Sequence, residues 1–226
     1  MQEIISKGML PVLTLKMEKG EQIFTECGGM SWMEDGIVMQ TTTNGGILKG
    51  LSRVFSDESF FLNSYICERD GAEIAFSSSL PGEIIYFNLA ENQSIIAQKG
   101  SFMVGSANVD LKLHLRKRIR ASIFGGEGFI MQRITGPGKV FLECDGNLVK
   151  KTIQKGETLK VDNGHIVAMT EGINMDIKMV KGIKNIIFGG EGLFLTTLSG
   201  EGTVWLQSMP VSKLAENLYP FFINDK

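Results

Sequence analysis

The hexapeptide Ile123-Phe124-Gly125-Gly126-Glu127-Gly128 recurs unchanged at residues 187–192, 64 residues further along the chain. The same offset carries Val140-Phe141-Leu142 to Val204-Trp205-Leu206. Identical letters over six positions, followed by a further match at the same offset, indicate an internal repeat. An internal repeat determines how a whole chain is divided into structural units.

The other half of the unit also repeats. Lys155-Gly156-Glu157 corresponds to Lys19-Gly20-Glu21, and residues 169–175 correspond to residues 33–39. A weaker version of the hexapeptide begins at Phe55. We therefore predict a single β-rich domain over residues 1–226, built from about three repeats. Two are continuous, at 55–115 and 124–180, and the third is 187–207 completed by 10–40, so that the two ends of the chain meet.

Alternation of apolar and charged residues favours strands. Residues 109–116 and 173–179 alternate strictly, which is typical of half-buried strands. Frequent glycine, 27 residues against 5 prolines, suits short strands joined by tight turns. We predict an all-β, internally repeated β-sandwich with a pseudo-threefold arrangement and a few short connecting helices. The helical or non-strand candidates are 47–55, 116–123 and 180–187, each expected to connect units, and 211–218 after Pro210.

Composition limits the function. The 226 residues are 43% apolar with a formal net charge of −2, which argues against global attraction to nucleic acid or anionic lipid. Three cysteines without a CxxC pattern predict reduced thiols and a cytoplasmic location. His114 and His165 are far apart, so we expect no zinc site, and no cofactor is predicted. We see no signal peptide and no apolar run long enough to span a membrane.

The Gly-Gly-Glu-Gly copies are the sharpest local motif. Glycine loops can present backbone N–H groups to an anion, with a glutamate as acid or base. A phosphate-binding loop would add Lys-Ser/Thr at a helix start, which is absent. We favour a tight turn or bulge before an inner strand. The candidate loop residues are Gly125, Gly126, Glu127, Gly128, Gly189, Gly190, Glu191 and Gly192.

A run of basic residues occupies the polar side of the strand at 109–116 and continues beyond it. One hypothesis is a surface for RNA, an acidic membrane or an acidic partner. The alternative, which we favour, is an exposed and solvated strand face, because no aromatic residue interleaves to stack on bases. The residues are Lys112, His114, Arg116, Lys117, Arg118 and Arg120.

The C-terminal stretch is apolar and aromatic. Tyr219, Phe221 and Phe222 would form an interface or a membrane-touching patch if exposed, and a simple C-terminal anchor if packed. The two alternatives are nearly even from the residues alone. This stretch is the main reason to expect self-association.

Three segments together resemble the altered-inheritance-of-mitochondria family. They are Gly28-Gly29-Met30-Ser31-Trp32-Met33, the segment from Gly45-Gly46-Ile47-Leu48-Lys49-Gly50-Leu51 into Glu58-Ser59-Phe60-Phe61, and the Phe-Gly-Gly-Glu-Gly copies. That family includes uncharacterised bacterial proteins and a mitochondrial branch linked to inner-membrane organisation. The resemblance implies an internally repeated β-sandwich similar to that of the tryptophan RNA-binding attenuation protein (TRAP-like), and it supplies no catalytic residues. The absence of a transit segment suits a bacterial, cytosolic member.

The leading hypothesis is thus a non-enzymatic binding or scaffold protein that acts as a homo-oligomer, with its protein partner unidentified. The first alternative is RNA or acidic-membrane binding through the basic strand face. The second is an enzyme that uses Glu127 or Glu191 beside the glycine loop.

Overall fold

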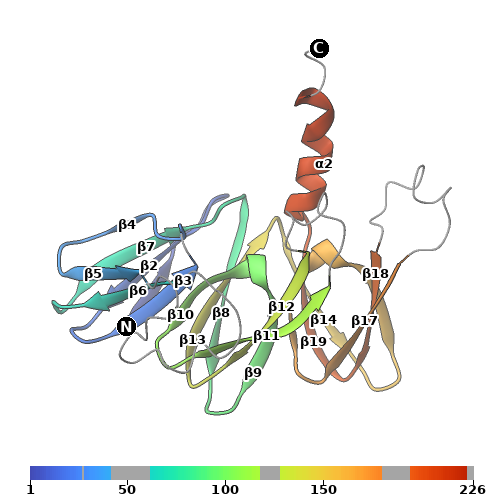
Figure 1. Ribbon diagram of the computed structural model, residues 1–226, viewed down its shortest axis with the longest axis horizontal. Coiled ribbons are helices and arrows are strands. Elements are labelled where there is room, and N and C mark those ends of the chain that lie inside the picture. Colours follow the sequence, from blue (N-terminus) through green and yellow to red (C-terminus); the bar gives the residue numbers. More distant parts are fainter. Residues whose placement is uncertain (27, 42–61, 118–127, 180–193, 223–226) are drawn as a thin grey trace.

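The computed structural model describes residues 1–26, 28–41, 62–117, 128–179 and 194–222 (Figure 1). Within these residues the chain forms antiparallel sheets, two 3₁₀ turns and one α-helix, so the all-β prediction is confirmed. No helix in this part of the chain has the length and apolar character needed to cross a membrane.

The strands form four sheets, named A to D, whose strand orders are as follows. Sheet A is β1 (Gln2–Ile5), β2 (Val12–Met17), β7 (Ala72–Ser77) and β4 (Trp32–Met33). Sheet B is β5 (Ile37–Thr41), β6 (Leu62–Cys67), β3 (Gln22–Glu26), β10 (Phe102–Ser106), β13 (Gly138–Asp145) and β8 (Gly82–Leu89). Sheet C is β11 (Asp110–Lys117), β12 (Phe129–Thr135), β9 (Ser94–Gln98), β16 (Ile166–Thr170), β19 (Gly202–Gln207) and β14 (Leu148–Ile153). Sheet D is β15 (Thr158–Asp162), β18 (Phe194–Gly200) and β17 (Ile173–Met179). The 3₁₀ turns are η1 (Lys99–Ser101) and η2 (Asn163–His165), and the helix is α2 (Val211–Phe222).

The four sheets are stacked, with a hydrophobic core between each neighbouring pair. On β3, Ile23 packs into the core between sheets A and B, while Phe24 packs into the core between B and C. On β9, Ile95 faces the B–C core and Ile96 faces the C–D core. Sheets B and C are therefore covered on both faces. Figure 1 shows the stack running along the long axis, from the blue N-terminal strands to the orange β17 and β18.

Burial along each strand follows from its place in the stack. In the terminal sheets one face is covered, so β2 buries Leu13, Leu15 and Met17 and leaves the residues between them more exposed. β17 alternates likewise, as predicted for 173–179. In contrast, the inner strand β16 buries four consecutive residues from Ile166 to Met169, because both of its faces are covered.

Similar runs of elements occur 64 residues apart. β9, η1 and β10 span 94–106, and β15, η2 and β16 span 158–170. The described strands of 10–40 lie in sheets A and B, whereas those of 187–207 lie in sheets C and D, and no ladder joins these described strands. The division of the chain into three repeats stays a prediction.

β11 pairs with β12, and β17 pairs with β18. Apart from Gly128, both copies of the hexapeptide, 123–128 and 187–192, lie outside the described residues. Of the helical candidates, 211–218 is confirmed by α2. Residues 116 and 117 belong to β11, and the rest of 116–123, together with 47–55 and 180–187, lies outside the described residues.

The two described cysteines, Cys67 and Cys144, are free and buried. Burial, with smaller contributions from Glu83 and Asp145, raises the pKa of the Cys144 thiol to about 12. Since the thiolate is the reactive form, Cys144 is a packing residue.

We predict that Ile23→Ala and Phe24→Ala each destabilise the whole stack. Each change opens a cavity in a core bounded by sheet B, and we expect losses in free energy of unfolding of about 2–5 kcal/mol and about 3–5 kcal/mol, respectively. Urea denaturation followed by circular dichroism measures both. Val149→Ala on β14, where the side chain is 41% exposed, is the control and should change stability by less than about 1 kcal/mol. Equal losses in all three variants would contradict the double burial of sheet B.

Candidate functional site

Helix α2 is the most distinctive surface feature of the described chain. It follows Pro210, whose carbonyl accepts hydrogen bonds from the N–H groups of Lys213 (2.9 Å) and Leu214 (3.1 Å). Proline at a helix start needs no donor of its own and supplies the required φ, so the helix begins there. In Figure 1, α2 stands away from the sheets.

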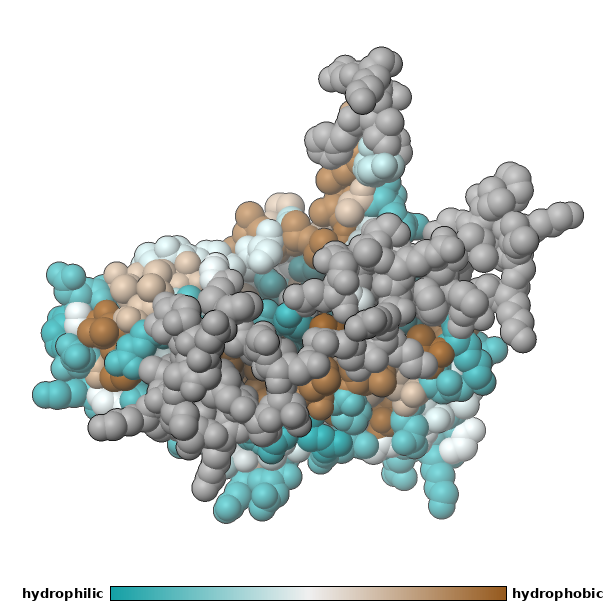
Figure 2. Space-filling model, viewed as in Figure 1, coloured by the Kyte–Doolittle hydropathy of each residue, from teal (hydrophilic) through white to brown (hydrophobic). Residues whose placement is uncertain are grey.

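The helix is amphipathic. Apolar residues occupy i, i+3, i+4, i+7 and i+8 from Val211, which is the spacing of one helical face. None of the described side chains of α2 is buried. Figure 2 shows apolar surface along one flank of the projecting helix and hydrophilic surface along the other. The exposed large apolar side chains are Val211 (57%), Leu218 (44%), Tyr219 (65%) and Phe221 (80%).

The polar flank of α2 carries no net charge. Lys213 Nζ lies 3.5 Å from Glu216 Oε2, one turn along the helix. Such an exposed pair adds little stability. An anionic membrane surface would favour a strongly cationic flank. The apolar flank is thus the part of α2 that can supply binding energy, and its polar flank gives no preference for an acidic surface.

The base of α2 is fixed to the stack by polar contacts around Gln207. The Asp145 N–H donates to Gln207 Oε1 (3.0 Å), and Gln207 Nε2 donates to the carbonyl of Gly164 (2.8 Å). His165 Nδ1 lies 2.7 Å from the carbonyl of Gln207. The Met209 N–H donates to the Asp145 carbonyl (3.0 Å). The direction in which the helix leaves the sheets is therefore set by β13, η2 and β19.

Asp145 is the unusual ionisable group at this base. Its carboxyl is buried, and this burial, together with the negative charge of Glu143, raises its pKa to about 6. Burial also raises the pKa of Glu143, opposed by hydrogen bonds from Ser79. The Ser79 hydroxyl also donates to Glu143 Oε1 (3.4 Å). The arrangement supports a structural junction that is sensitive to pH.

The predicted glycine loops fall almost wholly outside the described residues. Gly128 is described, and its φ of +83° is a conformation that glycine adopts at no steric cost. It directly precedes Phe129 at the start of β12, and the turn or bulge expected before this strand stays a prediction. Glu127 and the second copy at 189–192 lie outside the described residues. An enzyme that uses Glu127 or Glu191 beside the glycine loop therefore stays a hypothesis.

The predicted basic patch is only partly described. Lys112 and His114 are exposed on β11, as the alternation indicated. Lys112 Nζ lies 2.5 Å from Asp110 Oδ2, and neighbouring Arg133 forms an ion pair with Glu171. Burial, followed by the charge of Arg133, lowers the pKa of His114. These contacts reduce the positive potential of the face. The backbone of Arg116 and Lys117 belongs to β11, and Arg118 and Arg120 lie outside the described residues.

The aromatic tail is a predicted site at which large apolar side chains are open to solvent. Tyr219 and Phe221 are strongly exposed on α2, and Phe222 is the last residue of that helix. The sequence left open whether this stretch is exposed or packed, and the Tyr219 and Phe221 side chains are exposed. Their self-association remains a prediction.

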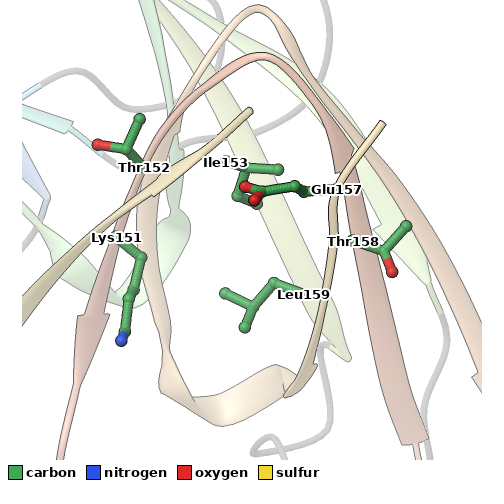
Figure 3. A pocket seen from close by; sticks show the side chains of 6 residues that line it. All are labelled: Lys151, Thr152, Ile153, Glu157, Thr158 and Leu159. Carbon is green, nitrogen blue, oxygen red and sulfur yellow. The ribbon is translucent and has the colours of Figure 1, made fainter. Parts of the chain in front are cut away.

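A shallow hollow beside the β14–β15 hairpin was not anticipated (Figure 3). Its volume is about 280 Å³, and it is lined by Lys151, Thr152, Ile153, Glu157, Thr158 and Leu159. Glu157 Oε2 accepts the N–H of Gln154 (2.9 Å), which closes the hairpin turn. The lining offers no nucleophile paired with a base. Among the described residues, no group of three or more His, Cys, Asp or Glu side chains is placed to hold a metal ion.

Comparisons with known proteins give a family, a relative and a similar fold. The model of the family described as "Mitochondrial biogenesis AIM24" matches residues 2–209. An uncharacterised protein of Streptococcus pyogenes serotype M6 is 28% identical over 216 residues, covering 92% of this chain and 85% of that protein. A crystal structure of a Streptococcus pyogenes protein superposes with a TM-score of 0.79 at 22% identity, covering 97% of this chain and 99% of the other. This last likeness shows the fold.

We predict that stability falls as pH rises from about 4 to about 6 through Asp145. Its folded pKa, about 6, lies above the usual value of 3.8, so the native state holds a proton that the unfolded state releases. Asp145→Asn should remove this dependence and raise the urea midpoint at pH 8, with less effect at pH 4. The exposed Glu201→Gln is the control and should keep the wild-type profile. A wild-type pH profile in Asp145→Asn would contradict this assignment.

Proposed function

The chain belongs to the mitochondrial biogenesis AIM24 family, as its resemblance predicted, and from this premise we propose that it is a non-enzymatic binding or scaffold protein that acts as a homo-oligomer through α2. One observation carries the proposal. An amphipathic helix of twelve residues projects from a folded stack with its apolar face in solvent.

The energetics of the helix support this proposal. Isolated helices of about twelve residues are marginal in water, and helices in proteins gain most of their stability by burying an apolar face. The exposed face of α2 has no such cover in one copy of the chain. Aromatic residues such as Tyr219 and Phe221 are typical of the buried centres of protein interfaces. A second copy of the chain is a partner that is present wherever the protein is present, and it covers the helix increasingly as the protein concentration rises.

The architecture also suits a scaffold. We infer that the stack consists of three successive six-stranded units, beginning at β2, β8 and β14, each sharing a sheet with the next. The elements at 82–145 and 146–207 support this inference, since β8 to β13 have counterparts in β14 to β19. Such an arrangement gives an extended body with many exposed positions for partners. The TRAP-like character implied by the resemblance belongs to this same proposal.

The basic strand face is the weaker candidate. Its described cations, Lys112 and neighbouring Arg133, are each paired with a carboxylate. A surface for RNA or acidic lipid gains its affinity from cations that release counterions on binding. Paired cations contribute less to such a release, so the described contacts favour α2 as the functional element.

We predict that the wild-type protein is an oligomer in solution and that Leu218→Ser dissociates it. Removing an apolar anchor from the centre of an interface should raise the dissociation constant about 10- to 100-fold. Size-exclusion chromatography with light scattering, over a dilution series, measures the mass. Asn217→Ser, on the polar flank of the same helix, is the matched control and should keep the wild-type mass. A wild-type protein that stays monomeric at the highest concentration would overturn the proposal.

A further inference from the structure

The two terminal sheets of the stack have different outer faces. On sheet D, three rows of facing residues cross the outer surface, and all but one of the side chains in them are polar. In strand order from β17 through β18 to β15, these rows are Asn174–Ser199–Thr158, Asp176–Thr197–Lys160 and Lys178–Leu195–Asp162. This is the composition of a surface that faces water. The outer face of sheet D therefore ends the stack without need of a cover.

Sheet A ends the stack differently. The inward residues of β2 are Leu13, Leu15 and Met17, so Thr14 and its cross-strand partners face outward. The ladder Ile4–Thr14–Ala75–Trp32 crosses the outer face from β1 to β4. Ile4 is 50% exposed and Trp32 is 53% exposed. Between them, Thr14 is partly exposed and Ala75 is fully buried. The outer face of sheet A thus carries a half-exposed apolar side chain on each edge strand, and we call this pair, Ile4 and Trp32, the Trp32 band.

The Trp32 band is flanked by a polar row without net charge. Gln2, Lys16 and Glu73 are cross-strand partners on this outer face, and Lys16 lies directly opposite Glu73. The polar flank of α2 is likewise neutral, through Lys213 and Glu216. Neither surface therefore repels the other, and neither attracts a strongly charged partner. An uncharged amphipathic element is the kind of partner that both surfaces fit.

We propose that α2 of one copy packs its apolar flank on the Trp32 band of a second copy, and that the exchange is reciprocal in a closed dimer. This inference rests on the proposed self-association and names its counter-surface. A helix covering the open face of a sheet is one of the standard layer arrangements in proteins. Figure 1 shows α2 rising from the upper side of the stack, with β4 and β7 at the N-terminal end of the stack.

Interface area favours this arrangement over pairing of the two helices alone. A helix of twelve residues is about 18 Å long and about 10 Å wide. One contact between two such helices buries less than the roughly 1,200 Å² at the lower end of stable interfaces. Two reciprocal helix-on-sheet contacts double the buried area. They also cover both exposed apolar surfaces of each copy. The dimer is then closed, because neither surface remains free to bind a third copy.

The test uses disulfide trapping between differently tagged full-length chains in which Cys27 is replaced by Ser. One chain carries Trp32→Cys and the other carries Tyr219→Cys. Cys67 and Cys144 are buried and stay in place. After mixing and mild oxidation, we expect the mixed Trp32→Cys and Tyr219→Cys pair to cross-link several-fold more than either variant with itself. Efficient cross-linking of Tyr219→Cys with itself, and none of the mixed pair, would show helix–helix pairing and overturn the inference.

Light scattering on point variants separates this inference from the proposed function. Trp32→Ser and Ile4→Ser should each shift the protein toward monomer, as Leu218→Ser does, while circular dichroism and the urea midpoint show a folded chain. Asp176→Ser, on the outer face of sheet D, is the control and should keep the wild-type mass. If Leu218→Ser dissociates the oligomer and folded Ile4→Ser and Trp32→Ser do not, the inference fails and self-association through α2 stands. If wild type itself is a monomer, both fail.

Discussion

The burial of sheets B and C on both faces is the constraint on which the rest of the structure depends. A strand with side chains on alternate faces normally contributes one face to a core, but β3 contributes Ile23 to one core and Phe24 to the next. Each inner sheet therefore needs apolar residues at consecutive positions and a further sheet on either side. The chain meets this need by building each inner sheet from two successive segments, so that neighbouring parts of the chain share a sheet and cannot separate into independent domains.

A stack of this kind has two end sheets, and no further sheet covers their outer faces. The outer face of sheet D carries rows of polar residues, as the end caps of repeat proteins do. Sheet A carries Ile4 and Trp32 in the corresponding position and leaves them half exposed. The same chain also leaves the apolar flank of α2 uncovered. Two apolar surfaces that are open to solvent in the described part of the chain are better explained by an assembly than by two separate defects in packing.

The sequence predicted the features that depend on local patterns. Alternation identified the half-buried strands at 109–116 and 173–179, and the Pro210 boundary identified α2. Sheet topology could not be predicted in this way. Matching letters indicate which segments are alike, and they do not say which strands pair: the described strands of 10–40 and 187–207 lie in different sheets.

For the same reason, only some residues of the candidate surface could be predicted from the sequence. Tyr219 and Phe221 lie in an obviously apolar stretch, so they were found. Trp32 belongs to a strand of only two residues, and its outward direction follows from its register with Ala75 on β7. Asp145 ends β13 in a hydrophilic turn sequence, and its burial arises from its contact with Gln207, 62 positions later in the chain. Long-range register of this kind has no local signature.

The position of α2 links the fold to the proposed role. Its base is held by backbone and amide hydrogen bonds from β13, η2 and β19, so its direction is determined by elements of sheets B and C at once. A helix on a loose tether would lose conformational entropy on every docking event, whereas a helix held at its base has lost much of it already. The junction around Gln207 therefore makes the exposed flank of α2 a pre-organised binding element. A rigid body that presents one such helix and one apolar sheet face has the two surfaces that the proposed assembly requires. Assembly through these surfaces needs no reacting group among the described residues.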